Sequence, residues 1–354
     1  MSGGEILIER RGGIGLVTLN RPQALNTLSL AMYRRFDPAL AEWAHDPAVR
    51  AVVVRGAGGR AFCAGGDVVA IYRARSEQGG GGYKADFFRE EYQLVRRVHR
   101  FPKPYVALMN GVTMGGGAGV AVNGAVRVAT EATVFAMPEV QIGLFPDVAA
   151  TRFLNLCPGR IGLYLALTGR RLGAADALYC GLATQFVPGE RLEALVGALA
   201  SLPGYEDPAA EVERAVAQHA ADPGPATLPA LRAEIDRVFA GDSVEAIVAA
   251  LERESAAWAR EALAAIATAS PLSLKLTFRQ LRHGATTVEA ALQLEYRLTQ
   301  HAMAGKDFFE GIRALLVDKD RKPRWQHPSL AAVRDAEVEA YFQPIGEREL
   351  TFPA

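Results

Sequence analysis

Two carboxylates stand alone in an apolar segment of the chain. Between Ala132 and Thr151 the sequence reads ATVFAMPEVQIGLFPDVAAT, and its only ionisable side chains are Glu139 and Asp147. A carboxyl group among apolar neighbours is costly to ionise, so its pKa rises toward the range useful for proton transfer. The pattern therefore indicates an acid–base pair, with helix capping or ordinary surface charge as the alternative interpretation.

The local backbone signals place both acids near the end of a strand. Each acid follows a proline, Pro138 or Pro146, and the residue before a proline favours extended backbone. The segment predicts a strand, FAMPE, that leaves the core into a loop, QIGLFPD. Loops at strand ends commonly carry reactive groups.

Two glycine loops share one design. AFCAGGDV places Gly65 and Gly66 before a predicted helix, and MGGGAGVA places Gly115, Gly116 and Gly117 before another. The first N–H groups of a helix have no internal partner and point outward with the positive end of the helix dipole. Two such amides that converge would form an oxyanion hole, although tight turns and close helix packing also explain these glycines. Neither loop has the GxGxxG or GK[ST] pattern of nucleotide-binding loops.

The remaining pattern indicates how these segments are positioned. A hairpin, ILIE and IGLVTLN, is followed by a helix over 28–43, which Pro38 should kink or divide. A recurring order of strand, strand and helix predicts an α/β core of stacked ββα turns over residues 1–201. From Leu202 to residue 354 the composition predicts amphipathic helices, one of them capped by Ser270 with Pro271 at its first position.

Composition excludes several classes of protein. The 354 residues include 39 Lys+Arg and 39 Asp+Glu, so a nucleic-acid partner and a polybasic membrane surface are not expected. Cys63, Cys157 and Cys180 are too widely spaced to indicate a metal site or a disulfide framework. The first residues, MSGGEILIERRGG, contain no apolar signal core, and we expect a soluble, cytoplasmic protein that is not inserted in a membrane.

Four segments in order resemble the crotonase (enoyl-CoA hydratase/isomerase) superfamily: LNRPQALNTLS, GRAFCAGGDV, PYVALMNGVTMGGGAGVA and FAMPEVQIGLFPDVAA. The resemblance covers nearly the whole chain. Within the superfamily the chain is most similar to the 3-hydroxyisobutyryl-CoA hydrolase branch, because of FFREEY, FPDV and the tail DFFEGIRALLVDKDRKPRW. The resemblance implies a crotonase-like spiral of ββα turns with a helical C-terminal region. It also implies an acyl-CoA substrate.

The resemblance assigns roles to five residues. It places the oxyanion hole at the amides of Gly66 and Gly116, the catalytic glutamate at Glu139 and the second acid at Asp147. Glu91, in REEY, matches a residue that contacts substrate. No cofactor is implied, because coenzyme A enters as part of the substrate, and a homo-oligomer remains open.

Departures from the family pattern separate the possible reactions. Similar hydratases carry a glutamate where this chain has Gly119 and a glycine where it has Asp147. The resemblance therefore implies hydrolysis of a short hydroxyacyl-CoA thioester, 3-hydroxyisobutyryl-CoA in valine degradation, to 3-hydroxyisobutyrate and CoA. Ala149 and Ala150 replace the glycines usual in hydrolases, which leaves the acyl group open. The alternatives are an isomerase or hydratase that uses Glu139 alone and a non-catalytic CoA-binding protein.

Overall fold

The computed structural model describes residues 4–75, 80–202 and 207–352. Contacts divide the chain into two compact units. Unit 1 comprises Met1–Gly66, Gln93–Phe135 and Arg171–Pro229, and unit 2 comprises Asp67–Tyr92, Ala136–Arg170 and Ala230–Ala354. Both units thus take segments from either side of residue 202. Beyond that residue every described element is helical, and the division at 201/202 stays a prediction as a domain boundary.

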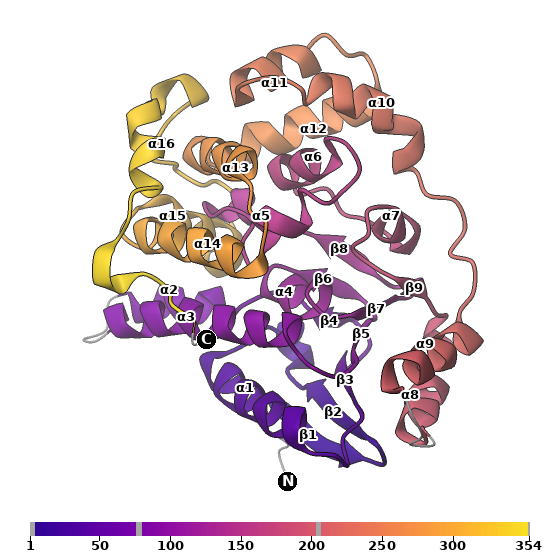
Figure 1. The fold of residues 1–354 in the computed structure, drawn as a ribbon. Coiled ribbons are helices and arrows are strands. Elements are labelled where there is room, and N and C mark those ends of the chain that lie inside the picture. Colours follow the sequence, from indigo (N-terminus) through magenta and orange to yellow (C-terminus); the bar gives the residue numbers. More distant parts are fainter. Residues whose placement is uncertain (1–3, 76–79, 203–206, 353–354) are drawn as a thin grey trace. The chain divides into compact units, whose positions relative to one another are not determined.

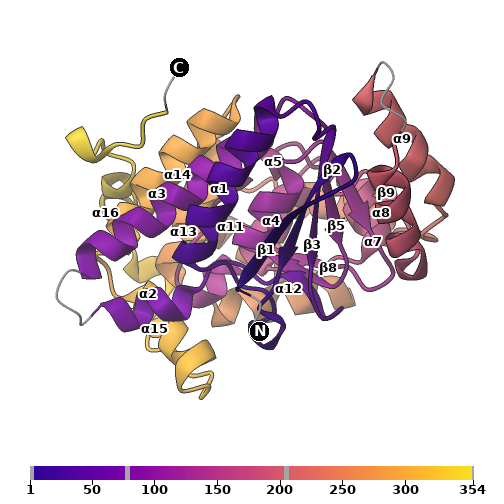
Figure 2. The same ribbon diagram turned by 90° about the horizontal axis from the view of Figure 1, so that it is seen from below.

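A six-stranded sheet organises unit 1 (Figures 1 and 2). The predicted hairpin is confirmed, because the first two strands pair antiparallel and turn at Gly12, which has φ 57°. The other neighbours in the sheet run parallel. In order across the sheet the strands are β1 (Ile6–Arg11), β2 (Ile14–Leu19), β3 (Ala51–Gly56), β5 (Tyr105–Met109), β7 (Val126–Ala129) and β9 (Gln185–Phe186).

A second sheet carries the two glycine loops. Its strands are β4 (Ala61–Cys63), β6 (Val112–Met114) and β8 (Val134–Ala136), in that order. The loop after β4 precedes α2 (Val68–Ala74) in unit 2, and the loop after β6 enters α4 (Gly116–Val122). A Cβ at Gly117 would lie 2.1 Å from the Cys63 carbonyl oxygen, so only glycine lets α4 pack this closely on β4.

Helices cover the large sheet of unit 1. Apolar side chains of α8 (Leu192–Ala200) and α9 (Pro208–His219) share one core with inward side chains of β2, β3, β5 and β7. α7 (Ala174–Tyr179) contacts β7 and β9, and α1 (Leu30–His45) contacts β1. The expected division at Pro38 is wrong, because α1 is one helix that contains Pro38, and a kink there stays a prediction. A buried face at Tyr33, Phe36 and Leu40 spans the proline and offsets the missing N–H.

Unit 2 is helical. Pro271 begins α13 as predicted, and the Ser270 hydroxyl accepts a hydrogen bond from the Ser273 amide at 3.1 Å. α13 contacts α5, α6, α11 and α16, and α14 contacts α5. Besides α2, its α-helices are α5 (Ala150–Phe153), α6 (Ile161–Thr168), α11 (Val244–Leu251), α12 (Ala257–Thr268), α13 (Pro271–His283), α14 (Val288–Ala302), α15 (Asp307–Ile312) and α16 (Asp335–Tyr341). Two more helices, α3 (Gly80–His99) and α10 (Leu228–Val238), contribute residues to both units.

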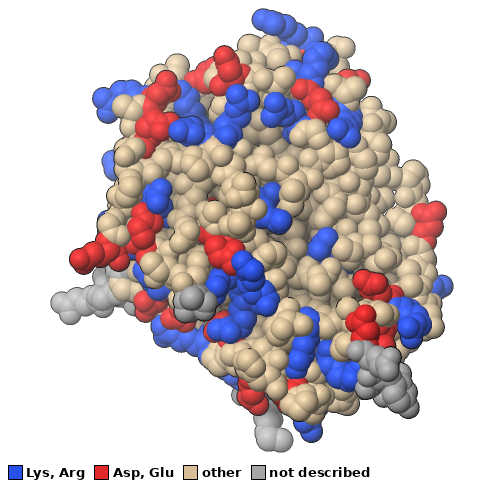
Figure 3. Space-filling view, in the orientation of Figure 1, with Lys and Arg blue, Asp and Glu red and all other residues tan. Residues whose placement is uncertain are grey.

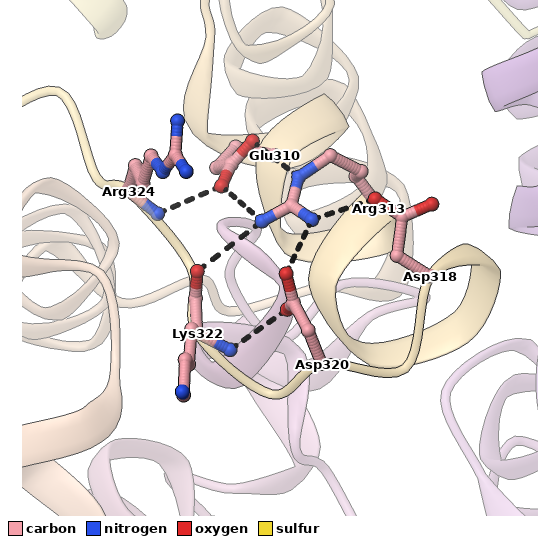
Figure 4. A network of polar contacts seen from close by, with 6 residues as sticks. All are labelled: Glu310, Arg313, Asp318, Asp320, Lys322 and Arg324. Carbon is pink, nitrogen blue, oxygen red and sulfur yellow. Dashed lines mark hydrogen bonds and ion pairs between the residues drawn. The ribbon is translucent and has the colours of Figure 1, made fainter.

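Arg313 forms a network of polar contacts with the segment that follows α15 (Figure 4). The Arg313 guanidinium donates to Glu310, Asp318 and Asp320, at 2.7 Å in each case, and to the Lys322 carbonyl at 3.2 Å. Arg313 therefore pairs with three carboxylates close together in the chain. Farther along, the Trp325 indole donates to the Thr268 carbonyl and Arg279 pairs with Glu339, so the tail packs on helices of its own unit.

The surface carries side chains of both signs. Figure 3 shows Lys and Arg interspersed with Asp and Glu on the face drawn there, which agrees with the balanced composition. Within the described ranges no helix is long and apolar enough to cross a membrane, and no cluster of His, Cys, Asp and Glu is arranged to hold a metal ion.

Candidate active site

Glu139 opens a short 3-10 helix, Glu139–Ile142, just after β8. The Ser270 amide donates to the Val140 carbonyl at 3.1 Å, which ties this turn to the start of α13. The turn closes at Gly143, whose φ is 72° and whose added Cβ would lie 2.3 Å from backbone atoms of Asp307. Glycine is therefore required there. These contacts fix the backbone that carries Glu139.

The Glu139 side chain is buried with little hydrogen bonding. Its residue is 5% exposed, and among the described residues its Oε2 atom has no hydrogen-bond partner. A buried polar atom without a partner is costly, and at an active site it is where substrate or water binds. Burial, and next the charge of Asp147, raise the pKa of Glu139 well above its usual value. The environment therefore favours a carboxyl group that can exchange a proton.

Asp147 lies near enough to Glu139 for their charges to interact, and a tyrosine side chain donates to it. The hydroxyl of Tyr92, on α3, donates to Asp147 Oδ2 at 2.7 Å. Burial raises the pKa of Asp147 to about 6, while the Tyr92 hydroxyl and the backbone amide of Asp147 oppose the rise. The two acids are thus unequal, because a phenol stabilises ionised Asp147 and Glu139 Oε2 lacks such a donor.

Two further acids share this environment within unit 2. Glu91 precedes Tyr92 on α3 and is buried, and its charge contributes to the raised pKa of both Glu139 and Tyr92. Glu295, on α14, is fully buried. Burial raises the pKa of Glu295 to about 8, opposed by hydrogen bonds from Thr151 and Ala149. In the described part of the chain, Glu139, Asp147 and Glu295 have no ion-pair partner.

The glycine loops come together within unit 1. A Cβ built on Gly65, whose φ is +121°, would lie 3.5 Å from the Met114 carbonyl oxygen and 3.8 Å from the Gly116 nitrogen. In the described structure neither the Gly66 nor the Gly116 amide donates a hydrogen bond to the protein backbone. Gly116 is the first residue of α4, where such an N–H has no internal acceptor.

The structure places the predicted residues in two groups. Glu91, Glu139 and Asp147 lie in unit 2, and Gly66 and Gly116 lie on neighbouring loops of unit 1. Sequence reasoning missed Tyr92 as a partner of Asp147, because it reads as one apolar position on the buried face of a helix. It also missed Glu295, whose side chain bonds a loop 146 residues earlier in the chain.

The buried acids predict how stability depends on pH. The pKa of Asp147 rises from 3.8 to about 6, and the pKa of Glu295 rises from 4.5 to about 8. The folded pKa of each group therefore exceeds its unfolded value. This contribution is fully present below the unfolded pKa values and is lost as pH rises through the folded ones. We expect the free energy of unfolding to fall from about pH 4 to pH 6 through Asp147 and from about pH 5 to pH 8 through Glu295, by roughly 1.4 kcal/mol per pH unit within the interval of each group.

Urea unfolding across this range measures the effect. The variant Glu295→Gln removes the group with the higher of these two pKa values, so its stability should depend less on pH between about pH 6 and pH 8. Equal slopes for the two proteins would contradict the assignment of a raised pKa to Glu295.

The sequence and the fold both have known relatives. The family model described as "Enoyl-CoA hydratase/isomerase" matches residues 14–342. The chain belongs to the enoyl-CoA hydratase/isomerase (crotonase) family. A curated relative is the mitochondrial 3-hydroxyisobutyryl-CoA hydrolase of Rattus norvegicus, 44% identical over 98% of this chain and 91% of the relative. The Homo sapiens enzyme of the same name is 42% identical over the same shares.

Two solved structures confirm the predicted fold class. An enoyl-CoA hydratase from Rhodobacter sphaeroides has a TM-score of 0.90 and 43% identity, covering 99% of this chain and 100% of that one. A carnitinyl-CoA dehydratase from Mycobacterium thermoresistibile has a TM-score of 0.91 and 42% identity, covering 99% of each chain. This member of the family therefore has a crotonase-like α/β fold with a helical C-terminal region. At comparable identity these relatives carry the names of different reactions, so the reaction depends on the site residues.

Proposed function

We propose that this crotonase-family enzyme hydrolyses a short hydroxyacyl-CoA thioester, most specifically 3-hydroxyisobutyryl-CoA in valine degradation, to the hydroxy acid and CoA. The observation that carries the proposal is the buried pair Glu139 and Asp147, with Asp147 held by the Tyr92 hydroxyl. α4 has Gly119 where similar hydratases have their second glutamate. The names of the rat and human relatives support the same reaction.

The proposed chemistry breaks the thioester C–S bond. The amides of Gly66 and Gly116 stabilise the negative charge that develops on the carbonyl oxygen, and one such donor is typically worth about 2.7–4 kcal/mol. Glu139 either removes a proton from the attacking water or attacks the carbonyl carbon to form an anhydride that water then cleaves. In both routes water supplies the new C–O bond, and the departing thiolate of CoA ends with a proton.

Asp147 and Glu91 complete the proposed site. Ionised Asp147 would accept a hydrogen bond from the substrate hydroxyl or from the water, and Glu91 would contact the substrate. A buried carboxylate is well suited to select a hydroxylated acyl group, because an acyl group without the hydroxyl leaves that carboxylate without a partner.

Release of free thiol tests the proposal. Purified protein is mixed with 3-hydroxyisobutyryl-CoA and, in parallel, with isobutyryl-CoA and a short enoyl-CoA, while a thiol reagent reports free CoA. We expect thiol release that is fastest with the hydroxyacyl substrate. Loss of enoyl absorbance without thiol release would favour the isomerase or hydratase alternative. Binding of CoA without turnover of any substrate would favour a non-catalytic protein.

The Tyr92→Phe variant should shift the pH profile of thiol release. The Tyr92 hydroxyl lowers the pKa of Asp147, so its removal raises that pKa further above its usual value. We expect the acidic limb of the kcat profile to move to higher pH by about 1 unit, the scale of one hydrogen bond to a charged group. Tyr296→Phe is the matched control, because that phenol accepts from Arg89 and its ring packs edge to face against Tyr92 without bonding Asp147. An unmoved limb in Tyr92→Phe would contradict this assignment.

We also propose a cytoplasmic location and an enzyme that needs no added cofactor. The rat and human relatives are named as mitochondrial proteins, so cell fractionation of the source organism is the direct test. Activity that survives dialysis against a chelator is expected from the proposed mechanism, in which no metal takes part.

A further inference from the structure

The backbone just after Asp147 adopts an unfavourable conformation. Val148 has φ 56° and Ala149 has φ 71°, and both residues are fully buried. Left-handed backbone is rare for residues other than glycine, and a β-branched residue such as valine is especially disfavoured there. Such a turn persists only where its surroundings hold it. Because it adjoins Asp147, whatever holds the turn also sets where the Asp147 side chain points.

Glu295 supplies the restraint from α14. Its Oε2 atom accepts from the Ala149 amide at 2.7 Å, and its Oε1 atom accepts from the Thr151 amide at 2.8 Å and from the Thr151 hydroxyl at 2.7 Å. Ala149 is the N-cap of α5 and has no capping side chain of its own. A carboxylate distant in sequence thus satisfies the free amides at the start of this helix.

Gln280, on α13, holds the other side of the same loop. Its side-chain nitrogen donates to the Pro146 carbonyl at 2.7 Å and to the Thr151 hydroxyl oxygen at 2.7 Å. Residues 146–151 are therefore bonded at both ends, and the strained pair at Val148 and Ala149 lies between the two restraints. Within the described structure, Glu295 forms its hydrogen bonds with this loop.

We infer that Glu295 is a positioning residue that fixes the strained turn after Asp147 and thereby holds the Asp147 carboxylate in its catalytic position. The inference rests on the proposed function, in which Asp147 meets the substrate hydroxyl or the water. In this inference Glu295 does not contact the substrate, and it acts through its hydrogen bonds to Ala149 and Thr151.

Asp176 provides a matched control. It is a buried carboxylate that accepts from the Thr227 amide at 2.7 Å, the Leu228 amide at 2.9 Å and the Thr227 hydroxyl at 2.7 Å. Glu295 and Asp176 thus make the same set of hydrogen bonds, two from backbone amides and one from a threonine hydroxyl. The bonds of Asp176 hold α10, so Asp176→Asn reports the general effect of losing such a carboxylate.

The experiment compares Glu295→Gln and Asp176→Asn, each alone and combined with Asp147→Asn. Both oxygens of Glu295 accept from a backbone amide, one from Ala149 and the other from Thr151. In glutamine an NH2 group replaces one of these oxygens, so one amide loses its acceptor and faces another donor. We expect Glu295→Gln to lower kcat on the order of 100-fold, the typical effect of misplacing a reacting group. KM should change little. The same substitution in the Asp147→Asn background should have almost no further effect on kcat, because both changes act through Asp147.

Amide hydrogen exchange gives a measure that needs no activity. Exchange at Ala149 and Thr151 should accelerate in Glu295→Gln and stay unchanged in Asp176→Asn. Unchanged kcat in Glu295→Gln would overturn the inference, as would an equal loss of kcat in both Asp147 backgrounds. If the unaltered protein releases no thiol from any hydroxyacyl-CoA, the proposed function fails. Exchange that is not faster in Glu295→Gln would overturn the inference independently.

Discussion

Replacing Glu139 with glutamine should lower kcat for thiol release roughly 100- to 10,000-fold, the range that a positioned acid–base group contributes. The amide has nearly the same shape as the carboxyl group, but it can neither take a proton from water nor form an anhydride with the acyl group. Binding should be preserved, because the change leaves the glycine amides of unit 1 untouched. The rate of thiol release at saturating substrate, followed with a thiol reagent, measures kcat. Calorimetric titration with CoA measures binding.

Glu131→Gln is a suitable control for this result. Glu131 is exposed, eight residues upstream of Glu139, and accepts from the Gly189 amide at 2.9 Å. Its variant should retain kcat within about twofold, as is usual for surface changes away from special features. If Glu139→Gln retained as much activity as Glu131→Gln, Glu139 would have no part in the chemistry.

The second large effect is expected at Asp147. Asp147→Asn keeps an acceptor for the Tyr92 hydroxyl but removes the negative charge, so kcat should fall on the order of 100-fold or more. Asp147→Gly recreates the residue found in similar hydratases, and thiol release should fall at least as far. Neither variant should gain hydration of an enoyl-CoA, because α4 still has Gly119.

Two readouts separate the possible outcomes for Asp147. Thiol release reports hydrolysis, and enoyl absorbance reports hydration, so both are followed for each variant. Full hydrolysis by Asp147→Gly would remove the distinction between hydrolase and hydratase on which the proposed function depends. A gain of hydration in that variant would show that Glu139 alone suffices for water addition.

Features that depend on neighbours in sequence could be predicted well. The start of α13 follows from Ser270 and Pro271, whose capping and backbone preferences act within one turn. The isolation of Glu139 and Asp147 follows from the apolar residues around them, and the structure does bury both. Pro38 shows the limit of such rules, because packing of the α1 face outweighs the local preference of proline to break a helix.

Features that depend on distant contacts could not be predicted. Glu295 sits in an ordinary amphipathic helix, where a glutamate normally faces solvent. Its burial depends on backbone amides near the turn at Val148 and Ala149 that need an acceptor. The residue types at that turn do not predict a left-handed backbone. The proposed reaction rests on two positions, Gly119 and Asp147, which became informative only through the resemblance to similar enzymes.

The contact between Glu295 and Ala149 also bears on the order in which the enzyme is assembled. It joins residues 146 apart in sequence, and contacts of such long separation carry a large entropic cost of loop closure. On the ribosome, Glu139 and Asp147 emerge long before α14. We therefore expect Asp147 to reach its final orientation late in synthesis, after the chain has passed residue 295, so that catalytic competence follows the helical region and does not precede it.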